Sequence, residues 1–199
     1  LSVDLQATIK AKALLGKSRH EPEHIASMPW QKVPAFYATL EEPTITHLAL
    51  RLLILTGARS KPIRFLHRDQ IEGAVWTIPA ENMKGRQGRT DDFRVPLGKE
   101  ALRVIELATP FQRGGFLFPS VRRGVISDAT MSRLMERRGM KERPHGFRSS
   151  LRTWLAEATD APHEVAERML AHVEGTSVSR AYQRSDHLEQ RRALLATWE

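Results

Sequence analysis

The chain has 199 residues, of which 41% are hydrophobic and 27% charged, so it carries enough apolar material for one core of ordinary size. Its 31 Lys and Arg exceed its 23 Asp and Glu, and the resulting net charge of +8 and pI near 10.3 favour a polyanionic partner, with nucleic acid the first to consider. The lack of cysteine excludes disulfides, Cys-ligated zinc, iron–sulfur clusters and thiol catalysis, and it is compatible with a reducing cytoplasm. The longest apolar run, Leu52 to Leu55, is far too short to span a membrane.

The first 29 residues show scattered charge and little sustained periodicity. We interpret residues 1–29 as a linker or arm with one short helix over 5–15. The sequence begins at Leu1 rather than Met, which suggests a fragment or processed product.

The first strong helical signal follows Pro43. Apolar side chains at Ile45, Leu48, Leu52 and Leu55 are spaced three and four residues apart, which places them on one helical face. Gly57 then predicts the end of this core helix.

The pattern changes to strand-like between residues 65 and 97. Two short β-prone pieces, 75–78 and 93–96, flank the polar and basic stretch 84–89. This arrangement predicts a small antiparallel sheet with a basic hairpin.

The rest of the chain is predicted to be helical, with Phe147, Leu151, Trp154 and Leu155 facing inward on one of the helices and Ser185 capping the last. The expected fold class is therefore α+β, mostly α-helical with one small antiparallel β-sheet. The predicted helices cover 100–108, 128–137, 146–158, 162–171, 176–184 and a final helix carrying Leu188, Leu195 and Trp198.

A basic segment lies between residues 133 and 152, where seven Lys or Arg stand against two Glu. A solvated charged face is the ordinary interpretation of such a run, and a phosphate-binding face is the alternative. Pro144 favours a helix start, whose first N–H groups would bind an anion. His145 and Arg148, three residues apart, would project to the same side.

Farther along, His172 and Tyr182 lie ten residues apart. Taken alone, His172 fits a helix-end or core histidine, and Tyr182 fits core packing. The other tyrosine, Tyr37, lies in a predicted helix and is interpreted as packing.

Several short motifs occur in order along the chain: Thr56-Gly57-Ala58-Arg59, Lys84, His145-Gly146-Phe147-Arg148, Leu170-Ala171-His172 and Ala181-Tyr182. Taken together, they resemble the active-site signature of the tyrosine recombinases, the phage integrase family. The resemblance covers residues 30–199, about the length of the family's catalytic domain, and it implies the catalytic-domain fold of these DNA breaking-rejoining enzymes. One departure is Pro62, which stands where many members carry an acidic residue three positions after the first arginine.

The resemblance implies a site-specific DNA recombinase, an integrase of a phage or integrative element, that works through a 3′-phosphotyrosyl intermediate. Tyr182 would attack the scissile phosphate and release a 5′-hydroxyl. A phenol has a pKa of about 10, so the attack needs a base or a dense positive field. By similarity, His145 would take the tyrosine proton.

The other members of the set would act on the phosphate. Arg59 and Arg148 would bind its non-bridging oxygens, where charge grows in the transition state. Lys84 would protonate the departing 5′ oxygen, and His172 would hydrogen-bond the phosphate. No metal ion or other cofactor is expected, because the phosphotyrosine stores the bond energy. His163, Glu164 and Glu167 lack the spacing of a zinc site.

The predicted partner is double-stranded DNA at attachment sites, with accessory DNA-bending proteins a further expectation. The full-length protein would form a homotetramer on DNA, whereas a fragment without the family's N-terminal DNA-binding domains could stay monomeric. A cytoplasmic, nucleoid-associated bacterial location follows from the same resemblance. The basic residues expected to contact DNA outside the catalytic set are Arg86, Arg89, Arg133, Arg137, Arg138, Lys141, Arg143 and Arg152.

Two alternatives share the fold. A type IB topoisomerase would use the same tyrosine chemistry to relax DNA, and a non-catalytic module would only bind it. The short spacing from His172 to Tyr182 favours the recombinase over the topoisomerase, and the presence of all six residue types argues against the non-catalytic module. A magnesium nuclease is disfavoured because no acidic cluster accompanies the basic segment.

Overall fold

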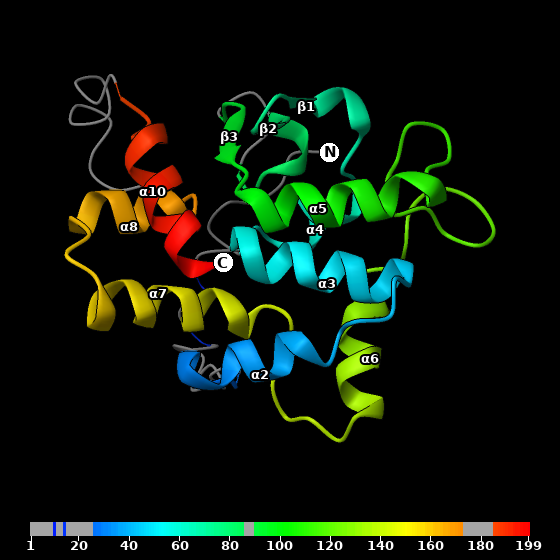
Figure 1. Ribbon diagram of the computed structural model, residues 1–199, viewed down its shortest axis with the longest axis horizontal. Helices are drawn as coiled ribbons and strands as arrows, with labels where there is room; N and C mark the ends of the chain where they lie inside the picture. The colour runs from blue at the N-terminus through cyan, green and yellow to red at the C-terminus, as the bar shows by residue number, and fades with distance from the viewer. Residues whose placement is uncertain (1–9, 11–13, 15–25, 86–89, 173–184) are drawn as a thin grey trace.

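The computed structural model describes residues 26–85, 90–172 and 185–199, together with Lys10 and Leu14. The molecule is mostly helical, with a three-stranded sheet at one edge (Figure 1), so the predicted α+β class is confirmed. No helix in the described ranges is long and apolar enough to cross a membrane. The main elements are α2 (Val33–Ala38), α3 (Ile45–Thr56), α4 (Ser60–Arg64), β1 (Ile71–Glu72), β2 (Val75–Ile78), β3 (Phe93–Pro96), α5 (Lys99–Ala108), α6 (Thr130–Arg137), α7 (Gly146–Ala158), α8 (His163–Met169) and α10 (Leu188–Trp198).

Helix α3 is the central element of the core. Every residue from His47 to Thr56 is buried, as expected for a helix that is covered on all sides. It contacts α4, α5, α6, α7 and α10, and Figure 1 shows α3 running beside α5. The Thr44 side chain caps its start, and Gly57 ends it with a left-handed φ of 62°. The core helix predicted from the apolar spacing is thus confirmed.

The sheet has the strand order β1-β2-β3 and is antiparallel throughout. Both predicted strands are present, with Trp76 opposite Val95 and Ile78 opposite Phe93. The two-residue strand β1 was not predicted. Helix α10 packs against β3, where the buried Arg191 donates to the carbonyl of Arg94 over 2.7 Å.

Helices α7, α8 and α10 share a second apolar cluster. Phe147, Leu151, Trp154 and Leu155 are all buried, as predicted for α7. The chain before α2 contacts α7, since the Ser150 hydroxyl donates to the carbonyl of Met28. A Cβ on Gly146 would lie 2.4 Å from the Ala26 carbonyl oxygen, so glycine permits this crossing.

The start of α10 differs from the prediction. Ser185 does not cap the helix, because its hydroxyl accepts the N–H of His187 instead. His187 is the cap residue and has a left-handed φ of 55°. The predicted helices over 5–15 and 176–184 and the tip of the basic hairpin, 86–89, lie wholly or mostly outside the described residues.

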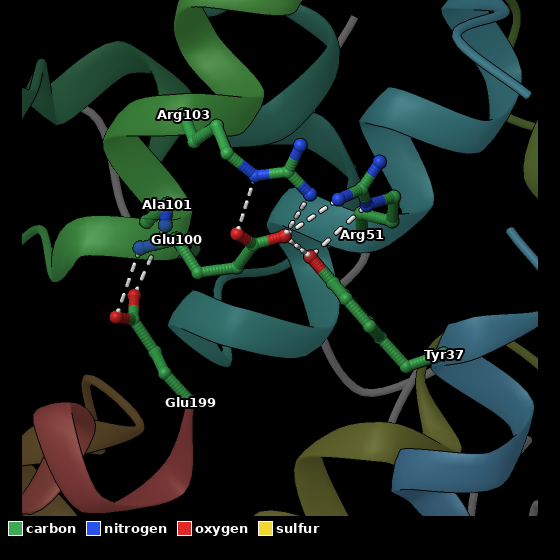
Figure 2. Close-up of polar contacts among 6 residues, drawn as sticks. All are labelled: Tyr37, Arg51, Glu100, Ala101, Arg103 and Glu199. Atoms are coloured by element: carbon green, nitrogen blue, oxygen red, sulfur yellow. Dashed lines mark hydrogen bonds and ion pairs between the residues drawn. The ribbon is translucent and has the colours of Figure 1, made fainter. Parts of the chain in front are cut away.

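A polar cluster ties α2, α3 and α5 together (Figure 2). The Tyr37 hydroxyl donates to Glu100 over 2.7 Å and accepts a bond from Arg51 Nε over 3.0 Å. Arg51 Nη2 and Arg103 Nε also donate to the Glu100 carboxylate. The side chain of Glu199 accepts the N–H groups of Glu100 and Ala101, which fastens the end of α10 to the start of α5.

Candidate active site

Arg148 lies where two helices end. Its Nη1 donates to the Gly57 carbonyl at the end of α3, and its Nη2 donates over 2.6 Å to the Leu170 carbonyl just after α8. Helix C-termini carry partial negative charge, so both carbonyls favour a cation between them. The side chain is buried, and this burial lowers the pKa of Arg148 to about 10, with Arg59 as a second cause, so the guanidinium is charged at neutral pH.

His172 follows the same helix end and reaches the same guanidinium. Its Nε2 lies 3.3 Å from Arg148 Nη2, and its Nδ1 lies 2.6 Å from an oxygen of Glu167. These contacts join two of the predicted site residues directly, although they are 24 residues apart in the chain.

Arg59 is the N-cap residue of α4 and lies two residues after Gly57, which ends α3. Burial lowers the pKa of this half-buried guanidinium. Within the described part of the chain its side chain has no hydrogen-bond or ion-pair partner, so its donors are free for a ligand. Arg59 and Arg148 both line a narrow pocket of about 10 Å³. The rest of its wall is mostly apolar and includes Pro62.

The pKa of His145 reports on its charged neighbours. This pKa is lowered first by partial burial and then by the positive charges of Arg148, Arg59 and Lys84. Arg148 bonds His172 and lines the same pocket as Arg59. The charges of Arg148, Arg59 and Lys84 act on His145 only over short distances, within about 10 Å in salt solution, so these residues lie near one another. A lowered pKa keeps the imidazole neutral at neutral pH, which is the form that accepts a proton.

Lys84 is exposed and follows β2 and the short 3-10 helix Ala80–Asn82. Tyr182 lies outside the described residues, so its distance from the cluster is not defined. Tyr37, the other tyrosine, can be assessed as a nucleophile. Burial is the largest cause that raises the pKa of Tyr37, and its hydroxyl is hydrogen-bonded to Arg51 and Glu100. A phenol held in this way is a poor nucleophile, which leaves Tyr182 as the candidate.

The predicted backbone anion site at the start of α7 is wrong. The N–H groups of Gly146, Phe147 and Arg148 donate to the carbonyls of Arg143, Pro144 and His145. Positive charge at this helix start therefore comes from side chains, not from free amides.

The predicted additional DNA contacts fall into three groups. Arg133, Arg137 and Lys141 are exposed. Arg138, Arg143 and Arg152 make intramolecular contacts: Arg138 bonds Thr39 and His47, Arg143 bonds three nearby carbonyls, and Arg152 bonds Glu167. Arg86 and Arg89 lie outside the described residues.

Metal ligands do not converge in the part of the chain described here, since it contains no group of three or more His, Asp or Glu side chains able to hold an ion. Glu167, weighed in the sequence only as a metal candidate, instead bonds Arg152 and His172.

Comparisons with known proteins identify the family of the chain. The model of the phage integrase family matches residues 27–189. The chain belongs to this family. It is 32% identical to the prophage integrase IntA of Escherichia coli K12 and 29% identical to the integrase of Enterobacteria phage P4, in each case over 92% of the chain. The two alignments cover only 46% and 45% of those integrases, so the chain spans about half their length.

Solved structures of other integrases share the fold of this integrase-family chain. The integrase of mycobacterium phage Brujita superposes with a TM-score of 0.66 and 21% identity, over 94% of this chain and 62% of that one. A lambda integrase dimer bound to a core site gives a TM-score of 0.59 and 18% identity, over 87% of this chain and 64% of the other. At these identities the likeness concerns the fold.

Proposed function

We propose that this chain is the catalytic portion of a site-specific DNA recombinase that cleaves and rejoins DNA through a 3′-phosphotyrosyl intermediate. The observation that carries the proposal is the cluster of Arg59, Lys84, His145, Arg148 and His172, drawn from four separate parts of the chain. Three cations, Arg59, Lys84 and Arg148, beside two imidazoles suit a reaction at a phosphodiester.

In the proposed reaction, Tyr182 Oη forms a bond to the scissile phosphorus and the bond to the 5′ oxygen breaks. His145 accepts the tyrosine proton, and Lys84 gives a proton to the leaving oxygen. The phosphotyrosyl bond keeps the energy for rejoining, so the reverse attack by a 5′-hydroxyl needs neither nucleotide nor metal ion.

The two arginines would bind the phosphate in different ways. Arg59, with no internal partner in the described residues, would bind a non-bridging oxygen with its full set of donors. Arg148 already donates to two carbonyls and would present only its remaining N–H groups. Charge on the phosphate grows during attack, so these contacts strengthen in the transition state.

The substrate and assembly follow from the net charge of +8 and from the relatives. One lambda integrase structure is a tetramer bound to a Holliday junction. By analogy, attachment-site DNA and a tetramer of the full-length protein are proposed here, with DNA-bending proteins as further partners. The named relatives are integrases, which favours recombination over DNA relaxation.

A nicked suicide duplex tests the proposal. Cleavage near the nick releases a short 3′ fragment, so rejoining fails and the covalent adduct accumulates as an SDS-resistant band. The adduct should form in excess EDTA at a rate within a small factor of the untreated one. Complete loss in EDTA, restored by magnesium, would instead indicate a metal-dependent nuclease.

A further inference from the structure

The end of α8 places two side chains next to each other. The N–H of Ala171 donates to the carbonyl of Arg168, and the N–H of His172 donates to the carbonyl of Glu167, each over 3.0 Å. With Ala171 at a left-handed φ of 50°, this is the double hydrogen-bond pattern of a Schellman motif. The motif brings the third-last helical residue, here Glu167, beside the second residue after the cap, here His172.

An apolar pair frequently accompanies this motif, but here the pair is polar. Glu167 Oε2 lies 2.6 Å from His172 Nδ1. A carboxylate only accepts hydrogen bonds, so Nδ1 must carry the proton of this bond. The Glu167 side chain is 15% exposed, and water therefore competes weakly for the bond.

The carboxylate is itself fixed from α7. Arg152 Nε donates to the other Glu167 oxygen over 2.6 Å. Burial acts to raise the pKa of Glu167, but the hydrogen bonds from His172 and Arg152, together with the charge of Arg152, outweigh it and the pKa is lowered. Glu167 is thus a charged, immobilised acceptor at neutral pH.

Arg152 and Arg148 lie one turn apart on α7, so their side chains share a face. Arg148 reaches Nε2 of His172, and Arg152 reaches the carboxylate that holds Nδ1. Both nitrogens of the imidazole are therefore held, through Glu167 on one side and by Arg148 on the other. Among the described residues, Glu167 is the acidic residue that bonds a member of the proposed catalytic cluster.

We infer that Glu167 is a positioning residue for His172: its carboxylate fixes the proton on Nδ1 and aims Nε2 at the phosphate site beside Arg148. The inference rests on the proposed function for the identity of that phosphate. When phosphate is bound, Nε2 would donate to it after taking up a proton, and the adjacent Glu167 carboxylate would stabilise the resulting positive ring. Pro62 cannot serve this purpose, because its side chain has no polar atom.

The first test needs no DNA. Nitrogen-15 NMR of the imidazole reports which ring nitrogen carries the proton. The unchanged chain and a Glu164→Gln control, altered at an exposed site on the same helix, should show His172 with the proton on Nδ1. Glu167→Ala should lose this preference, and a ring that still carries its proton on Nδ1 in that variant would overturn the inference.

The second test uses cleavage of the suicide duplex. Glu167→Gln keeps the size of the side chain and removes its charge, and we expect the single-turnover rate to fall on the order of tenfold to 100-fold, as when a partner that orients a functional histidine is removed. DNA affinity should change less than about twofold.

A double-mutant cycle separates positioning from a structural role. In a His172→Ala background, Glu167→Gln should lower the rate by less than about twofold, because its partner is gone. An equal loss in both backgrounds would show that Glu167 only supports the fold, and would overturn the inference. If the unchanged chain forms no adduct at all, the proposed function fails, whereas the NMR result still decides whether Glu167 fixes the ring.

Discussion

The carboxylate of Glu100 offers a quantitative test of how the core is held together. Hydrogen bonds from Arg103, then Tyr37 and Arg51, outweigh burial and lower the pKa of Glu100 from 4.5 to about 2. A shift of about 2.5 units corresponds to about 3 kcal/mol of folding free energy. Arg103 is 57% exposed, so solvent screens the largest cause and we expect about 2 kcal/mol.

The pH dependence of this contribution has a definite sign. The folded-state pKa is depressed, so the stabilisation is fully present above pH 4.5 and is lost as pH falls toward 2. Glu100→Gln keeps the side-chain size and removes the charge. Its free energy of unfolding should be lower by about 2 kcal/mol at pH 7, and the gap should narrow by about half at pH 3.

Urea unfolding followed by circular dichroism at several pH values measures this gap. Glu106→Gln, an exposed change on the same helix, is the control and should show no gap at either pH. A Glu100→Gln gap that is the same at pH 3 and pH 7 would refute the assignment to charge, and a gap below about 0.5 kcal/mol would refute the magnitude.

Three further outcomes follow from the structure. Ala171→Gly should stabilise the chain by about 0.5–1 kcal/mol in thermal unfolding, because glycine adopts the left-handed φ at lower cost; destabilisation would contradict the Schellman geometry. Lys84→Met should raise the NMR-detected pKa of His145 by on the order of a few tenths of a unit, whereas Lys32→Met should leave it unchanged; equal shifts would show that the neighbouring charge is not the cause. Arg59→Ala should slow suicide-substrate cleavage by on the order of 100-fold with a much smaller loss of affinity, and an equal loss of both would indicate simple phosphate anchoring.

Arg59→Ala tests the catalytic role of an arginine more directly than Arg148→Ala does. Removing the Arg148 side chain would leave the carbonyls of Gly57 and Leu170 without a donor in a buried place. Unsatisfied buried groups cost about 1–3 kcal/mol each, so Arg148→Ala would confuse lost stability with lost chemistry.

The elements with strong periodicity could be predicted from the sequence, and those set by tertiary contacts could not. Helix α7 has the predicted bounds because its apolar residues repeat with a helical period and are all buried. Strand β1 has two residues, too few to show alternation. Helix α10 begins after His187 in a left-handed conformation, two residues beyond the Ser185 cap that the sequence predicted.

The same distinction holds for the site. The cluster could be predicted because the order of its motifs resembles a known family, although the sequence itself does not show that the residues meet. Glu167 was missed because its role depends on Arg152 from another helix and on a turn that Ala171, rather than glycine, completes. A glutamate five residues before a histidine at a helix end is the signal that could have indicated the pair.

The central claim is tested most directly by locating the covalent bond. The protein is incubated with a nicked suicide duplex that carries the attachment site of its genetic element, and the adduct is digested and mapped by mass spectrometry. The account predicts a DNA phosphate on the peptide that contains Tyr182, full adduct formation by Tyr37→Phe and none by Tyr182→Phe. An adduct on Tyr37 or any other residue, or an adduct that persists in Tyr182→Phe, would contradict it.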